Sequence, residues 1–170
     1  MGRLTGKVAI ITGASKGMGA DIAKAFARED AAVVVNYATS REGADKVVAE
    51  INGHGGKAIA AQGNVANVGD IKRIFAETLS SFGGLNILVN NAGVCEFSPL
   101  ENLTTELYTR LFNTNVLGTL LATREAVKLF GKKGVVELAT VMGDYVMVGM
   151  VLTTIDQHLP PDRPARLPPR

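Results

Sequence analysis

The sequence has few of the residues that disulfides, metal sites and base-stacking surfaces require. Its 170 residues include one cysteine, two histidines and no tryptophan, and only 5% are aromatic. The single cysteine, Cys95, excludes an internal disulfide and fits a reducing compartment, so we expect a cytoplasmic protein. Cys95, His54 and His158 stand at unrelated spacings, which predicts no metal site. Scarce aromatic residues also argue against stacking on nucleic-acid bases.

Long runs of one residue type are missing as well. The 18 basic and 16 acidic residues are interspersed and leave a net charge of +2, so no basic block favours nucleic acid. The longest apolar run, Val146–Leu152, is far too short to span a bilayer. Residues 1–7 contain no apolar segment typical of a secretory signal. We therefore expect a protein that binds neither membranes nor nucleic acids.

Short apolar runs alternate with segments of helical period along most of the chain. Spacings of three and four residues predict one helix over Val68–Phe82 and another along Val116, Leu120, Thr123, Val127 and Phe130. Nearly continuous apolar runs are typical of strands covered on both faces. The pattern predicts an α/β fold, a doubly wound parallel sheet with right-handed crossovers. The predicted strands are Val8–Ile11, Ala32–Val35, Ala58–Ala61, Asn86–Val89 and a fifth beginning at 134–136.

A glycine-rich segment, Thr12–Gly19, links the first predicted strand to a helix that begins near Met18. Gly13 would permit the tight turn, Gly17 the close approach of a pyrophosphate, and Gly19 the packing of the helix on the sheet. The helix would direct free N–H groups and the positive end of its dipole at the phosphates. Because the segment follows a strand and precedes a helix, we interpret it as a dinucleotide-binding loop rather than a simple turn.

Three motifs together resemble those of the short-chain dehydrogenase/reductase family. TGxxxGxG is matched by Thr12–Gly19, NNAG by Asn90–Gly93, and the catalytic asparagine of the family by Asn115. The resemblance runs from about Arg3 to about Val136 and is strongest to 3-oxoacyl-carrier-protein reductases and glucose-dehydrogenase-like enzymes. It implies a Rossmann fold and an oxidoreductase that exchanges hydride between a nicotinamide cofactor and a small carbonyl compound or secondary alcohol. Members of the family are usually homodimers or homotetramers.

The cofactor preference is argued from the charge that follows the second predicted strand. Members that prefer NAD carry an acidic residue there, whereas the stretch from Val35 to Arg41 contains none. Thr39 and Ser40 would donate hydrogen bonds to a 2′-phosphate, and Lys16 and Arg41 would add positive charge. Alternatively, Thr39 and Ser40 only cap a helix and both cations are solvated. We expect NADP(H), with NAD less favoured.

The residues expected to bind the cofactor follow the motifs and the ends of the predicted strands. Asn64 stands where the family usually has an aspartate, whose side chain meets the adenine amino group. The full set is Gly13, Ser15, Lys16, Gly17, Met18, Gly19, Asn36, Thr39, Ser40, Arg41, Asn64, Val65, Asn90, Ala92 and Gly93.

The family's catalytic residues are matched only in part. Asn115 corresponds to the asparagine that supports a proton-relay water, and Thr140 to the serine that orients the substrate carbonyl. The family's tyrosine, followed by lysine four residues later, is missing: Thr153 and Thr154 stand near its place, and Tyr145 comes too early. A free tyrosine has a pKa of ~10, so proton transfer at neutral pH needs that nearby cation.

Beyond about Val136 we find no resemblance to the family. The expected architecture is a dinucleotide-binding Rossmann domain over residues 1–140, C-terminally truncated relative to the family. An unmatched, Pro/Arg-rich tail over residues 141–170 is predicted to be irregular from residue 159. Two functions stay open: an NADP(H)-dependent oxidoreductase, and an NADP(H)-binding pseudoenzyme or inactive fragment that lacks the YxxxK pair.

Overall fold

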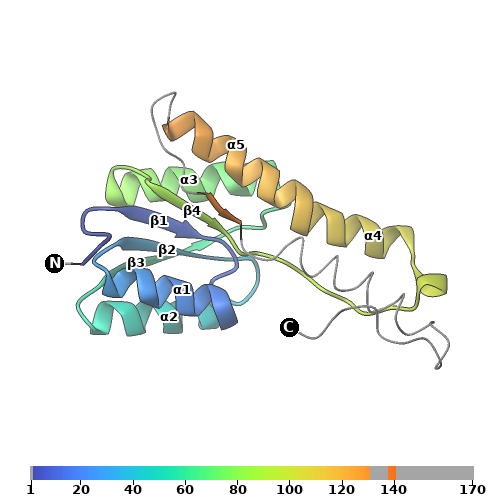
Figure 1. Ribbon diagram of the computed structural model, residues 1–170, viewed down its shortest axis with the longest axis horizontal. Helices are drawn as coiled ribbons and strands as arrows, with labels where there is room; N and C mark the ends of the chain where they lie inside the picture. Colours follow the sequence, from blue (N-terminus) through green and yellow to red (C-terminus); the bar gives the residue numbers. More distant parts are fainter. Residues whose placement is uncertain (1, 131–137, 141–170) are drawn as a thin grey trace, which may run out of the picture.

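The computed structural model describes residues 2–130 and 138–140. In this part of the chain, five strands form one parallel sheet in the order β3-β2-β1-β4-β5 (Figure 1). The strands are β1 (Val8–Ile11), β2 (Ala32–Tyr37), β3 (Lys57–Gln62), β4 (Ile87–Asn90) and β5 (Leu138–Thr140). The helices are α1 (Gly17–Arg28), α2 (Arg41–Gly53), α3 (Val68–Phe82), α4 (Thr105–Phe112) and α5 (Gly118–Phe130), with a 3-10 turn, η1 (Leu100–Asn102), and a π-helical turn, η2 (Asn113–Leu117). The expected doubly wound α/β fold is confirmed.

The sheet is covered by helices on both faces, which explains its nearly continuous apolar strands. Helices α1 and α2 lie on one face, and α3 and α5 on the other (Figure 1). Along β1, Ala9 and Ile11 belong to the core beneath α1 and α2, whereas Val8 and Ile10 belong to the core beneath α3 and α5. Alternate residues of one strand therefore fill two separate cores.

Helix α3 has the bounds that its periodicity predicts. Asn67 caps it, since the Asn67 Oδ1 atom accepts a hydrogen bond of 3.0 Å from the Asp70 N–H. It ends at Gly83, whose φ of 76° is left-handed. The buried residues on α3 are Ile71, Ile74, Phe75 and Thr78.

The stripe predicted for the second helix is wrong. Leu120 is 61% exposed and Val127 is 52% exposed. The buried face of α5 is instead made of Gly118, Leu121, Ala122 and Ala126. Gly118 lets the beginning of this helix lie close to the loop after β3, since a Cβ atom there would be 2.6 Å from Cγ2 of Val65.

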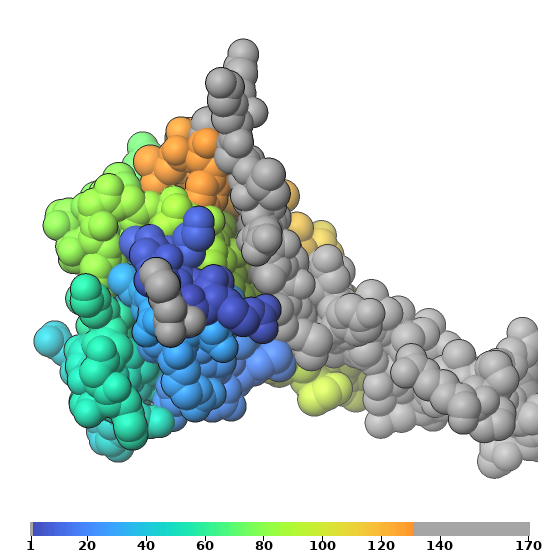
Figure 2. Space-filling view, turned by 60° about the vertical axis from the view of Figure 1, so that its left-hand side comes forward, coloured from blue at the N-terminus to red at the C-terminus, as the bar shows by residue number. Residues whose placement is uncertain are grey.

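The N-terminal segment closes the edge of the sheet at which the strands begin. Figure 2 shows it in dark blue, across the face formed by the amino ends of the strands. The Leu4 N–H donates to the Glu29 carbonyl at 2.9 Å, and the Gly2 N–H donates to the Asp30 carboxylate at 2.5 Å. The opposite edge, at the carboxyl ends of the strands, is where the loops of the candidate site gather.

Several sequence predictions fall outside the described residues. They are the start of the fifth strand at 134–136, the tail at 141–170 with its irregular part from 159, and the residues Tyr145, Thr153 and Thr154. Among the helices that are described, none is both long enough and apolar enough to cross a bilayer.

Candidate functional site

A cleft of about 550 Å³ lies at the carboxyl ends of β1 to β4. In open α/β sheets this edge is where ligands bind, at the point where the strand order reverses. Thirteen of the residues predicted from the sequence line the cleft. They are Gly13, Ser15, Lys16, Gly17, Met18, Gly19, Asn36, Thr39, Ser40, Asn64, Val65, Ala92 and Gly93.

The residues that line the cleft differ at a few positions from the cofactor-binding and catalytic residues predicted from the sequence. Arg41, Asn90 and Asn115 are not among the lining residues in the part of the chain that the structure describes. Five further lining residues were not predicted: Ala38, Gly63, Asn91, Val94 and Thr114. Ala38 and Gly63 carry no polar side chain, so the sequence holds no residue-type signal for their place in the cleft.

The glycines of the loop after β1 have different structural reasons. Gly13 has a φ of 63°, and a Cβ atom there would lie 2.8 Å from the Ala92 Cα atom. A Cβ atom on Gly19 would meet the Asn91 side chain and lie 2.7 Å from the Gly13 carbonyl oxygen. Gly17 has a φ of 55°, yet nothing lies within 4 Å of its Cβ position. Gly13 and Gly19 are thus required by the fold of the loop, whereas Gly17 borders open space in the cleft.

The amino end of α1 gives this space a positive electrostatic character. The helix has 12 residues and no acidic residue in its first turn. Lys16 occupies its N-cap position, and its side chain makes no capping hydrogen bond. Since the first N–H groups of a helix have no intrahelical partner, they remain available to an anion.

The loop is fixed to the end of β4 by Thr12 and Asn91. The buried Thr12 hydroxyl oxygen accepts hydrogen bonds from the N–H groups of Asn91, at 2.9 Å, and Ala92, at 3.0 Å. The Asn91 amide in turn donates to the carbonyl oxygens of Thr12, at 2.8 Å, and Gly13, at 3.1 Å. The NNAG motif therefore holds the glycine loop in place, although almost 80 residues separate the two in the sequence.

The end of β2 places two hydroxyl groups at the cleft. Thr39 and Ser40 are exposed and line it. Ser40 holds the N-cap position of α2, but its side chain makes no capping hydrogen bond. The alternative in which Ser40 serves as a capping side chain is therefore wrong. Arg41, 79% exposed in its side chain, begins α2 and lies 3.5 Å from the Asp45 carboxylate.

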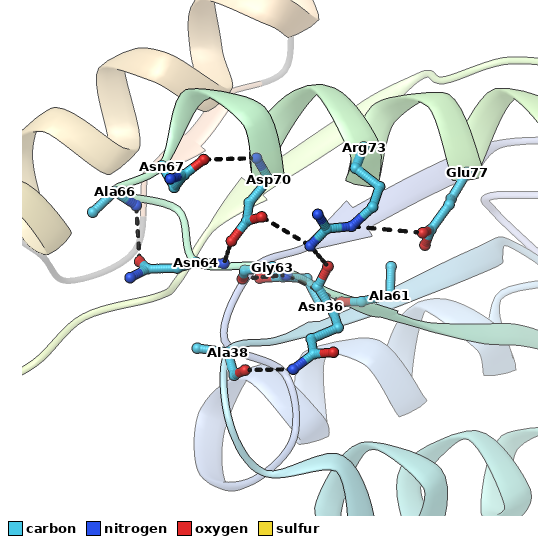
Figure 3. A network of polar contacts seen from close by, with 11 residues as sticks. Asn36, Ala38, Ala61, Gly63, Asn64, Ala66, Asn67, Asp70, Arg73 and Glu77 are labelled. Atoms are coloured by element: carbon cyan, nitrogen blue, oxygen red, sulfur yellow. Dashed lines mark hydrogen bonds and ion pairs between the residues drawn. The ribbon is translucent and has the colours of Figure 1, made fainter.

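The loop after β3 is held by a polar network on α3 (Figure 3). The Asn64 N–H donates to the Asp70 carboxylate at 2.8 Å, and the Asn64 Oδ1 atom accepts from the Ala66 N–H at 3.0 Å. Arg73 donates to the Gln62 carbonyl at 3.1 Å and lies 2.9 Å from the Asp70 carboxylate. The Asn64 N–H, and then Arg73, hold the pKa of Asp70 below its ordinary value.

Asn115 lies in the π-helical turn η2 and is 6% exposed. Its side chain pairs with the backbone of Val94: Oδ1 accepts from the N–H at 2.8 Å, and Nδ2 donates to the carbonyl at 2.9 Å. A π-bulge of this kind is frequent at functional sites. Here the asparagine fixes the segment that follows β4, where it enters the cleft.

The ends of β4 and β5 lie next to each other. Asn90 is paired with Thr140 in the parallel register, which places Thr140 at the same edge of the sheet as the cleft. The Asn90 amide donates to the Thr123 hydroxyl of α5 at 3.2 Å. Within residues 2–130 and 138–140, no three His, Cys, Asp or Glu side chains gather closely enough to hold a metal ion.

The sheet order and the cleft at its carboxyl edge define a Rossmann-type α/β domain. A family model described as short chain dehydrogenase matches residues 7–153. The chain belongs to the short-chain dehydrogenase family. The match extends past Val136, the point near which the sequence resemblance is predicted to end.

Individual relatives agree with this assignment. The chain is 50% identical to an uncharacterized oxidoreductase of Methylorubrum extorquens over 86% of its own length and 60% of that protein. It is 45% identical to versicolorin reductase 1 of Aspergillus parasiticus, over 74% of this chain and 48% of that one. A short chain dehydrogenase from Burkholderia cenocepacia, solved in complex with NADP, superposes with a TM-score of 0.74 and 39% identity, covering 78% of this chain and 54% of that one. The chain thus spans about half to three-fifths of the length of these relatives.

Replacing Asp70 with asparagine should make the protein less stable at neutral pH. Because the folded-state pKa of Asp70 is depressed, its stabilisation is complete above the unfolded value of about 3.9 and is lost as the pH falls through the folded value. The free energies of unfolding of wild type and Asp70→Asn, measured in urea, should therefore differ at pH 7 and converge below about pH 4.

The control is Asp45→Asn, which removes only an exposed ion pair. It should change the free energy of unfolding by less than about 1 kcal/mol. A difference between wild type and Asp70→Asn that stays constant from pH 7 to pH 3 would contradict the role given to this carboxylate.

Proposed function

We propose that this chain is the NADP(H)-binding part of an oxidoreductase that interconverts a small carbonyl compound and a secondary alcohol. The observation that carries the proposal is the open space at Gly17, beside the acid-free amino end of α1. Both the missing Cβ atom and the positive dipole end suit a pyrophosphate group. The NADP complex of the Burkholderia cenocepacia relative supports the choice of ligand.

The sheet order supports one direction for the bound dinucleotide. The phosphates belong at the loop between β1 and α1, in the middle of the sheet. The 2′-phosphate would accept hydrogen bonds from Thr39 and Ser40 and be attracted by Lys16 and Arg41. Beyond Thr39 and Ser40 the cleft continues to Asn64, on the side of β3. The adenine base of the cofactor would lie in this part of the cleft. The nicotinamide half belongs on the opposite side, toward the segment after β4.

Bound at that side, the cofactor supplies or accepts the hydride. The residues of this chain that border it are Asn91, Gly93, Val94 and Thr114, with Asn115 fixing the backbone of Val94. Thr140 ends β5 beside Asn90 and would orient a substrate oxygen through its hydroxyl. These residues bind and orient; they do not include a group that transfers a proton at neutral pH.

A second candidate is an NADP(H)-binding protein without turnover. The sequence favours it at one point: none of the three tyrosines, Tyr37, Tyr108 and Tyr145, is followed by a lysine four residues later. The proton donor with a lowered pKa that the family uses is therefore missing from this sequence. Binding and catalysis are consequently tested separately.

Substituting Gly17 with alanine should weaken NADPH binding, by about tenfold or more, because the methyl group would enter the space proposed for the pyrophosphate. Gly83→Ala is a matched control. Gly83 also has a positive φ and open space around its Cβ position, but it ends α3 away from the cleft.

Both variants carry the same left-handed strain of roughly 1–2 kcal/mol. Fluorescence titration with NADPH should therefore separate them, while thermal unfolding should not. Equal affinities of the two variants for NADPH would contradict the placement of the phosphates at Gly17.

Removing Lys16 and Arg41 together should lower the affinity for NADPH by about tenfold and leave the affinity for NADH unchanged. The two cations act on the 2′-phosphate, which NADH lacks, and their effect should weaken with added salt. Lys46→Ala, an exposed cation farther along α2 that pairs with Glu42, is the control. If calorimetry gives equal losses for NADPH and NADH, the preference does not arise from these cations.

Catalysis by this chain is tested by following NADPH absorbance with a ketone substrate. Without a tyrosine–lysine pair we expect no oxidation of NADPH above the rate in buffer. Steady, ketone-dependent oxidation by the pure protein would contradict this expectation and exclude the binding-only alternative.

A further inference from the structure

Asn36 is a buried polar residue at the carboxyl end of β2, with 1% of its surface exposed. Its Oδ1 atom accepts a hydrogen bond from the Gly13 N–H at 3.2 Å. Its Nδ2 atom donates to the carbonyl oxygens of Ala61, at 3.1 Å, and Gly63, at 3.0 Å (Figure 3). Its own backbone carbonyl accepts from the Ala14 N–H at 2.8 Å. Both the donor and the acceptor of the amide are thus engaged by the protein backbone.

These contacts join the two loops that form opposite parts of the cleft. Gly13 and Ala14 begin the loop after β1, and both of their N–H groups are directed at Asn36. Ala61 lies next to the last residue of β3, and Gly63 begins the loop that carries Asn64. A single side chain therefore bridges the phosphate loop and the end of β3 with the loop that follows it.

A primary amide suits this position. One backbone N–H needs an acceptor, and two carbonyl oxygens need donors, all within reach of one buried side chain. An aspartate would supply the acceptor but would place a buried negative charge against two carbonyl oxygens. A leucine would fill the volume and leave the N–H and both carbonyl groups without this partner.

We propose that Asn36 is a positioning residue for the bound dinucleotide, which fixes the spacing between the phosphate-binding loop and the base-binding loop without a side-chain contact to the ligand. The inference rests on the proposed NADP(H)-binding function. It assigns Asn36 an indirect role, in place of the direct cofactor contact expected from its position in the sequence.

The test compares Asn36→Ala with Asn52→Ala. Asn52 is a matched control because its amide also bridges the backbone: Nδ2 donates to the Ala58 carbonyl at 3.1 Å, and Oδ1 accepts from the Ala58 N–H at 2.8 Å. That bridge joins α2 to the beginning of β3, outside the cleft. Asn36→Ala removes three side-chain hydrogen bonds at a buried position, and Asn52→Ala removes two at an exposed one. Binding is therefore measured at a temperature at which circular dichroism shows each variant to be folded.

Two probes separate positioning from general destabilisation. NADPH spans both loops, whereas adenosine 2′-monophosphate lacks the pyrophosphate. Asn36→Ala should weaken NADPH binding by about tenfold or more and the binding of adenosine 2′-monophosphate by less than about threefold. Asn52→Ala should leave both affinities within about twofold of wild type. If Asn36→Ala does not fold, Asn36→Thr, which keeps a hydroxyl able to accept from Gly13, should show the same preferential loss for NADPH.

Equal losses of affinity for the two probes, or equal effects of the Asn36 and Asn52 variants, would overturn the positioning role. Wild-type affinity of Asn36→Ala for NADPH would overturn it as well, and would leave the proposed function intact. Failure of the wild-type chain to bind NADPH would overturn both, which distinguishes the two claims.

Discussion

The close approach of the turn after β1 to the segment after β4 is the constraint on which the candidate site depends. At Gly13 the two backbones are so near that a single added carbon would lie 2.8 Å from the Ala92 Cα atom. This proximity lets the Thr12 hydroxyl and the Asn91 amide connect the two segments through several hydrogen bonds. With the turn held there, α1 begins above the centre of the sheet, and its free N–H groups are directed into the cleft. Gly17 can then remain open to a ligand, because the close approaches at Gly13 and Gly19 already determine the loop.

The asparagine side chains around the cleft bind the protein's own backbone. Asn36 and Asn115 each accept one backbone hydrogen bond and donate at least one. The Asn91 amide donates to two backbone carbonyl oxygens. Burying such amides is favourable only when their hydrogen bonds are satisfied, and in return they fix loop geometry. The groups left for a ligand include the backbone N–H groups of the α1 terminus, the hydroxyls of Thr39 and Ser40, and the side chain of Lys16. This division suits a site that recognises phosphates.

The sequence predicted the parallel sheet, the bounds of α3 and most of the cleft lining, because apolar runs and glycine spacing reflect local physical requirements. It failed where tertiary packing decides. On α5 Leu120 and Val127 are exposed while Gly118 and Ala126 are buried, and a side chain at Gly118 would collide with Val65. Sequence patterns placed Asn36 and Asn90 at strand ends beside the proposed ligand, but a pattern does not show which group of the protein each amide meets. Asn91 was missed for the same reason.

The central claim, that a dinucleotide binds along the carboxyl edge of the sheet, is tested most directly by amide hydrogen exchange with and without saturating NADPH. The account predicts slower exchange in the loops around Ser15–Gly19 and Gly63–Val65, where ligand and backbone meet. Residues 2–7, at the opposite edge of the sheet, should exchange at an unchanged rate. Protection that is absent from both loops, or that falls mainly on the amino edge, would contradict the account.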